Sequence, residues 1–124
     1  MFKLKTKWFH KWAKKNKLLD DVLLDTIFNL ENNLSSVNLG SGLFKVRVAS
    51  LNSGKSSSFR TIIVYKKNDK AVVVYGFKKN EQKNLSQDEL KHFKTLAKDI
   101  LRLSNDDVKQ AIKKQVFIPI GEKL

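Results

Sequence analysis

Apolar residues at helical spacing predict two helices in the first third of the chain. Trp8 and Trp12 lie four residues apart in the basic segment 7–17, so they share one face of a helix. A second helix is predicted for residues 17–33, where the apolar stripe comprises Leu19, Leu23, Ile27 and Leu30. A short strand is expected over residues 2–5, ahead of both helices.

The apolar period then changes to two, which predicts a β-meander in the middle of the chain. In residues 44–48 the apolar side chains alternate with the basic side chains of Lys45 and Arg47, which face the other way. Residues 59–66 and 71–78 are rich in β-branched and aromatic residues and are joined by a polar turn, as expected for two further strands.

Helical signals return in the last third. Ser86 and Glu89 fit a capping box ahead of an apolar stripe, and Ser104 with Asp107 fits the start of a shorter helix. The apolar run VFIPI near the end predicts an edge strand, in which the proline limits pairing. These elements predict one α+β domain over residues 1–124, with an antiparallel-rich sheet of four to five strands, an N-terminal helical hairpin and C-terminal helices.

Positive charge is concentrated on the predicted meander. The chain carries 25 Lys and Arg against 12 Asp and Glu, a formal net charge of +13. Residues 38–80 contain one acid, Asp69, and nine of the basic residues: Lys45, Arg47, Lys55, Arg60, Lys66, Lys67, Lys70, Lys78 and Lys79. Such a balance favours nucleic acid, an acidic protein or an anionic membrane surface as partner.

Several other classes of site find no support. The chain has no cysteine, so disulfides and cysteine-bound metals are excluded, and neither a metal nor another cofactor is expected. Gly54-Lys55-Ser56 resembles the end of a phosphate-binding loop but lacks the upstream glycine. His10 and His92 are far apart in sequence and are expected to have packing or surface roles. No apolar run reaches the length of a signal peptide or a membrane span, so a cytoplasmic protein is expected.

The basic residues on the strands are the best candidates for chemistry. Arg47, Arg60, Lys78 and Lys79 lie on, or at the end of, three adjacent predicted strands. Hairpin geometry is expected to bring them together, and the planar arginine side chain binds phosphate oxygens in a bidentate manner. The segment 50–58 is polar and is expected to form a flexible basic loop beside them. A phosphate site is therefore predicted, with a solvated or salt-bridged sheet face as the alternative.

Three motifs resemble those of the RelE-like toxins of bacterial toxin–antitoxin modules, and the HigB-type branch fits best. They are GLFKVR at 42–47, GKS at 54–56 leading to Phe59-Arg60, and YGFKKN at 75–80. They occur in order, and the resemblance covers nearly the whole chain.

This resemblance implies a metal-independent endoribonuclease that cleaves messenger RNA in the ribosomal A site by attack of the ribose 2′-hydroxyl. It implies catalytic roles for Arg60, Lys79, Arg47 and Lys45, and RNA binding by Lys55, Lys66, Lys78 and Phe77. It also implies a cognate antitoxin, usually of the helix-turn-helix type. Some relatives carry a catalytic tyrosine where this chain has Leu85, so catalysis is expected to depend on the arginines and lysines.

Three alternatives remain open on the sequence. A ParE-like relative would poison DNA gyrase, whereas a non-catalytic module would bind RNA or the ribosome and leave transcripts intact. The basic, tryptophan-containing segment 3–17 also suits a membrane surface, although packing of the two tryptophans into the core is favoured.

Overall fold

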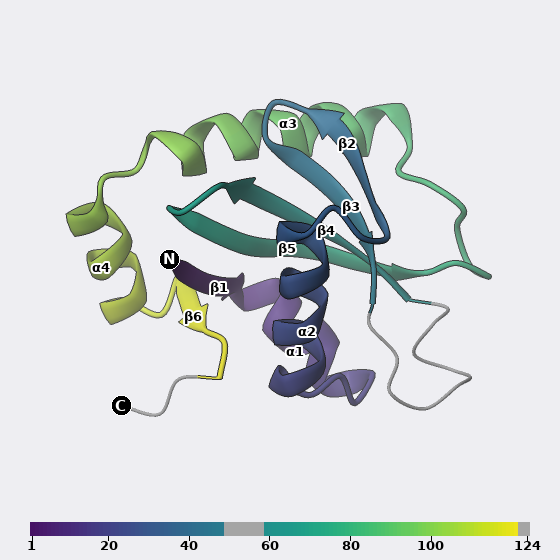
Figure 1. The fold of residues 1–124 in the computed structure, drawn as a ribbon, viewed down its shortest axis with the longest axis horizontal. Helices are drawn as coiled ribbons and strands as arrows, with labels where there is room; N and C mark the ends of the chain where they lie inside the picture. Colours follow the sequence, from purple (N-terminus) through teal and green to yellow (C-terminus); the bar gives the residue numbers. More distant parts are fainter. Residues whose placement is uncertain (49–58, 122–124) are drawn as a thin grey trace.

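The computed structural model describes residues 1–48 and 59–121. They form three layers, in which a central sheet lies between helices on both of its faces (Figure 1). Helix α3 (Gln87–Arg102) covers one face of the sheet, and α1 (Lys7–Lys15) and α2 (Asp20–Glu31) cover the other. A short helix, α4 (Asn105–Lys113), follows α3. No helix in the described part of the chain has the length and apolar character needed to span a bilayer. The predicted α+β class is confirmed.

Within the described residues the sheet has six strands, so the predicted four to five is wrong. The strands are β1 (Phe2–Thr6), β2 (Ser36–Gly40), β3 (Leu43–Arg47), β4 (Phe59–Lys66), β5 (Lys70–Lys78) and β6 (Phe117–Pro119). Their order is β2-β3-β4-β5-β1-β6, and the pairs are antiparallel except for β1 with β5. Strand β2 was missed because its sequence, SVNLG, has little strand propensity and forms only against β3.

Alternating side chains divide the core between the two faces. On β3 and β4, Val46 and Ile63 pack with α1 and α2, whereas Leu43, Ile62 and Val64 pack with α3. The predicted alternation is therefore confirmed. Both predicted capping boxes also form, at the starts of α3 and α4.

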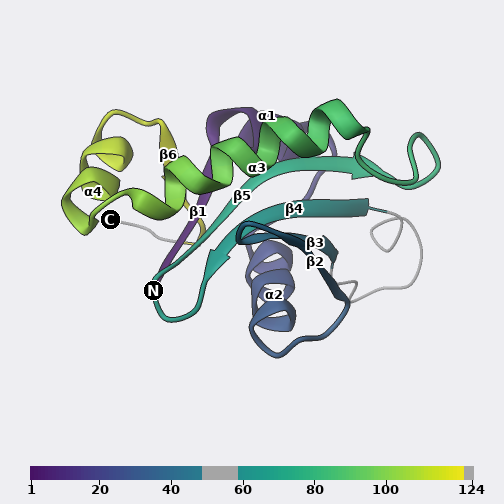
Figure 2. The same cartoon turned by 90° about the horizontal axis from the view of Figure 1, so that it is seen from above.

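The first two helices do not form the expected hairpin. They lie apart on the same face of the sheet, α1 against β5 and α2 against β3 (Figure 2). Trp12 packs against Gly76 and belongs to the core. Trp8 is 48% exposed and stacks on Tyr75, with ring centroids 4.9 Å apart. Packing of both tryptophans into the core is thus correct only for Trp12.

Among the described residues, two lysines are buried and serve the fold. The side chain of Lys70 is fully buried and donates hydrogen bonds to the carbonyl oxygens of Ile100 and Leu103, at 3.2 and 2.9 Å, at the end of α3. A cation there satisfies carbonyls that have no helical partner and complements the helix dipole. The ammonium of Lys5 lies 2.8 Å from a carboxylate oxygen of Asp20 and joins β1 to the start of α2.

The Lys5–Asp20 pair predicts a pH-dependent stability. Burial alone would raise the pKa of Asp20, but hydrogen bonds from Lys5 and from the Gly121 amide outweigh it and hold the pKa below its usual value. The stabilisation is therefore present above the unfolded-state pKa of about 3.9 and is lost as the pH falls through the folded-state pKa. We expect Asp20→Asn to lower the free energy of unfolding by about 1–3 kcal/mol at neutral pH, because buried Lys5 loses its charged partner.

Urea unfolding near pH 7 and near pH 3 measures this effect. The difference between wild type and Asp20→Asn should shrink at the lower pH, because the carboxyl of the unfolded wild type is then largely protonated and the stabilisation from its lowered folded-state pKa is being lost. Asp25→Asn, at an exposed position of the same helix, is the matched control and should have little effect at either pH. A deficit of Asp20→Asn that is independent of pH would show that the charge is not responsible.

Candidate functional site

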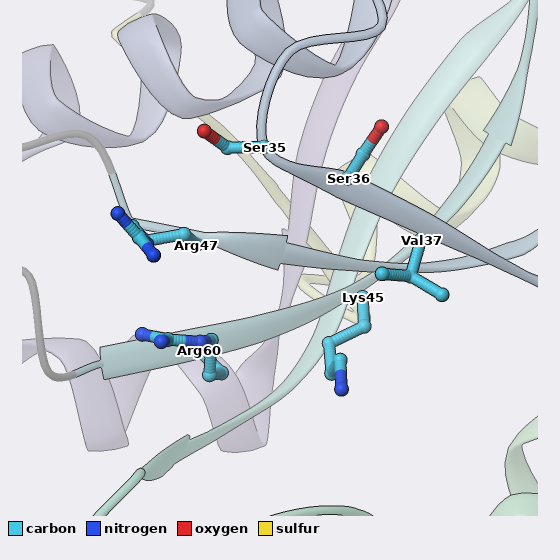
Figure 3. A pocket seen from close by; sticks show the side chains of 6 residues that line it. All are labelled: Ser35, Ser36, Val37, Lys45, Arg47 and Arg60. Atoms are coloured by element: carbon cyan, nitrogen blue, oxygen red, sulfur yellow. The ribbon is translucent and has the colours of Figure 1, made fainter.

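Three basic side chains project from the α3 face of the sheet, where β3 ends and β4 begins. Arg47 and Arg60 are direct register partners on the two antiparallel strands, and Lys45 lies two residues earlier on β3. The three line an open hollow of about 380 Å³ (Figure 3). Its other lining residues come from β2 and the turn before it, namely Ser35, Ser36 and Val37. The hollow is thus basic, with residues of the β2 segment along its border.

Core packing on the opposite face holds the two arginines in place. Val46 and Val48 flank Arg47, Phe59 precedes Arg60, and all three apolar side chains are buried on the α1–α2 side. Because successive side chains of a strand point to opposite faces, both arginines must point away from that core. A shift of the strand register by one residue would turn the two arginines toward the core and bury them. Figure 3 shows Arg47 and Arg60 extending in the same direction, while Lys45 reaches away from them.

The electrostatics of this pair favour an anion. Burial lowers the pKa of Arg60, and the neighbouring charge of Arg47 lowers it further. An arginine nevertheless stays protonated, so the two positive charges persist side by side. Arg60 also donates a 3.1 Å hydrogen bond to its neighbour's carbonyl oxygen, on Phe59. A phosphate between the two guanidinium groups would offset their repulsion and accept bidentate hydrogen bonds.

A polar network that sequence analysis missed holds Lys45. Its ammonium donates a 2.6 Å hydrogen bond to the side-chain oxygen of Asn84. The Gln82 amide bridges the Asn84 carbonyl to the carboxylate of Glu89, which also accepts a hydrogen bond from the Tyr75 hydroxyl. The capping box identified Glu89 as a residue of the α3 start, but its contact with Tyr75 depends on how α3 packs over the sheet. Lys45 is thereby tied to the start of α3.

Hydrogen bonding also fixes the charge state of this network. The backbone amide of Ser86 donates to Glu89 and lowers the pKa of the carboxyl, and the Tyr75 and Gln82 side chains add to this against the opposing effect of burial. Burial, followed by the hydrogen bond with Glu89, raises the pKa of Tyr75. At neutral pH the network therefore consists of an ionised carboxylate and a neutral phenol.

The structure does not bring Lys78 into this cluster. The pairing of β4 with β5 shifts between Ile62 and Ile63, so Val74 is an extra, bulged residue of β5. The bulge reverses the alternation that follows it. Lys78 consequently shares a face with Phe59, with its ammonium 5.9 Å from the centre of that ring, and lies opposite the face of Arg60. The expected convergence of Lys78 with Arg60 is wrong.

The other predicted site residues lie in different parts of the structure. Lys79 is exposed in the turn after β5, two residues beyond Phe77, the register partner of Arg60. Phe77 itself is only 4% exposed and packs in the core beneath α3, so its ring face is not open to a base. Lys66 lies at the other end of β4, 3.8 Å from Asp69. Lys55 lies outside the described residues.

The histidines lie elsewhere. His10 is on α1, where burial and then the charge of Lys5 lower its pKa, and His92 is on α3 with its ring against Phe93. Neither lines the basic hollow. Among residues 1–48 and 59–121, no three His, Asp or Glu side chains gather closely enough to hold a metal ion together.

Comparison with protein families gives one match. The family described as the RelE toxin of the RelE/RelB toxin–antitoxin system matches residues 1–120. A search of curated proteins found no match to the chain. The family match covers every helix and strand described above and all three residues of the basic cluster.

The arginine pair predicts that the site destabilises the free protein. Like charges directly opposite each other on neighbouring strands cost about 0.2–1 kcal/mol. We therefore expect Arg47→Gln to raise the free energy of unfolding by a similar amount at low salt, and the gain to shrink as salt screens the repulsion. Urea unfolding of wild type and variant at low and high sodium chloride measures this.

Any lost positive charge relieves some repulsion in a chain of net charge +13, so a matched control is required. Lys109→Gln removes the same charge from an exposed position on α4. The free energy of unfolding should rise clearly less in Lys109→Gln than in Arg47→Gln. Equal gains, or a loss of stability in Arg47→Gln, would contradict a specific cross-strand repulsion.

Proposed function

This chain belongs to the RelE family of toxins from toxin–antitoxin systems, and we propose that it is a ribosome-dependent endoribonuclease that cleaves messenger RNA. The observation that carries the proposal is the basic hollow, in which Arg47 and Arg60 stand opposite each other with Lys45 beside them. A scissile phosphate is an anion of suitable size and charge for two adjacent guanidinium groups. Membership of the family implies a cognate antitoxin.

The proposed reaction needs no metal. The ribose 2′-hydroxyl gives up its proton to a water molecule and its oxygen attacks the adjacent phosphorus, while the bond from phosphorus to the 5′-oxygen breaks. The products are a 2′,3′-cyclic phosphate and a 5′-hydroxyl, whose oxygen takes up a proton. Negative charge develops on the non-bridging oxygens of the phosphorane, and fixed cations stabilise this charge more than that of the ground state.

Each basic residue has a proposed part in this reaction. Arg60, held by the β4 backbone and partly buried, stabilises the phosphorane. Arg47 and Lys45 orient the phosphate, with Lys45 kept in place by Asn84. The ammonium of Lys79, at the end of β5, is the proposed proton donor to the leaving 5′-oxygen. Because Leu85 has no ionisable group, no tyrosine takes part at that position.

The finer assignments follow from the sequence motifs. We place the chain in the HigB-type branch because the strand motif of residues 42–47 and the strand end of residues 75–80 both fit that branch. A helix-turn-helix antitoxin and cleavage in the ribosomal A site belong to the same proposal. Lys78 remains a candidate for RNA binding, from the opposite face of the sheet.

The proposal predicts that Arg60→Ala folds normally but no longer inhibits growth. Loss of one fixed donor to the transition state costs on the order of 10²–10³-fold in rate. Induced expression followed by primer extension on a translated reporter measures cleavage, and circular dichroism of the purified protein checks the fold. Cleavage by the wild type should require translation.

Lys67→Ala is the matched control, because it removes an exposed cation in the turn after β4, at the end of that strand far from the hollow. It should retain full toxicity. A folded Arg60→Ala protein that remains fully toxic would refute the assigned site. Intact transcripts, together with cleaved DNA trapped on gyrase, would instead indicate the ParE-like activity.

A further inference from the structure

Helix α3 carries three lysines on one flank. Lys91, Lys94 and Lys98 recur at intervals of three and four residues, so they lie on one side of the helix. Asp99 follows Lys98 and so points about 100° away from it around the helix axis, whereas Asp88 lies one turn before Lys91, at the edge of the lysine side. Lys91 and Lys98 are exposed and Lys94 is half-buried. The structure records no ion pair for any of the three lysines within residues 1–48 and 59–121.

The lysine flank of α3 faces the β2–β3 hairpin and leads toward the basic hollow. The ammonium of Lys94 lies 3.5 Å from the position that a β-carbon would take on Gly40, at the end of β2. The three lysines line a second open hollow, together with Gln87, Leu90 and Thr95. Toward its start, α3 is joined through Glu89, Gln82 and Asn84 to Lys45. The start of α3 is therefore connected to β3, the strand that carries Lys45 and Arg47.

We propose that this lysine track, defined as Lys91, Lys94 and Lys98, binds the sugar–phosphate backbone of the RNA strand that enters the hollow. The inference rests on the proposed function, since it takes single-stranded RNA as the substrate. The track extends about 10 Å along the helix axis. It contains no carboxylate, so it suits consecutive phosphates better than a protein surface of mixed charge. The lysines hold the strand without reading its bases.

Binding of a single-stranded RNA with methylated 2′-hydroxyls tests the proposal without requiring cleavage. The track variant carries Lys91→Gln, Lys94→Gln and Lys98→Gln. Affinity is measured by fluorescence anisotropy across a salt series. For single strands the logarithmic salt slope is roughly 0.7 per phosphate contacted, so loss of three contacts should lower the slope by about 2. Thermal melting of the variant should match that of the wild type.

A matched control removes equal charge from α4 and its C-terminal cap through Lys109→Gln, Lys113→Gln and Lys114→Gln. Its slope should stay close to that of the wild type. The proposal would be overturned by an equal decrease of the salt slope in both triple variants, or by an unchanged slope in the track variant. An equal loss for duplex RNA, or normal RNA binding combined with a selective loss of affinity for polyglutamate, would also overturn it.

The same measurements separate this proposal from the proposed function. If the salt slope of the track variant decreases as expected but the wild type never cleaves RNA, the lysine track is supported and the nuclease assignment is contradicted. If the wild type cleaves RNA and the salt slope of the track variant is unchanged, the nuclease assignment is supported and the lysine track is contradicted.

Discussion

The repulsion between Arg47 and Arg60 is the constraint on which the functional account depends. Their register pairing places two permanent positive charges opposite each other, and the apolar side chains on the reverse face prevent either strand from slipping to separate them. The fold thus keeps a positively charged site whose unfavourable energy a bound anion would reverse. Such preorganisation is what a phosphoryl transition state requires, because its charge is met by groups that need not move.

High basic charge has more than one role in this molecule. Lys70 is fully buried and caps the carbonyl end of α3, and Lys5 is buried against Asp20. Neither is available to a ligand. Exposed groups remain on the α3 face of the sheet and on one flank of α3. A net charge of +13 therefore indicated an anionic partner in general, but only burial and side-chain direction distinguish structural cations from those proposed to bind RNA.

Local sequence patterns predicted most elements of the fold but only part of the site. The alternation around Val46 and the capping box at Ser86 were sufficient because each depends on neighbours in sequence. Strand β2 and the separation of α1 from α2 depend on tertiary packing. The bulge at Val74 reversed the direction of Lys78 and of Phe77, and no local signal revealed it. Asn84 was missed because its contact with Lys45 joins segments 39 residues apart.

The proposed function requires that one phosphate group binds between the guanidinium groups of Arg47 and Arg60. A crystal structure with a ribodinucleotide whose 2′-hydroxyl is methylated tests it most directly. We expect a phosphodiester oxygen within about 3 Å of a nitrogen of each arginine. A dinucleotide bound elsewhere, or arginines turned apart onto protein carboxylates while the ligand is present, would contradict it.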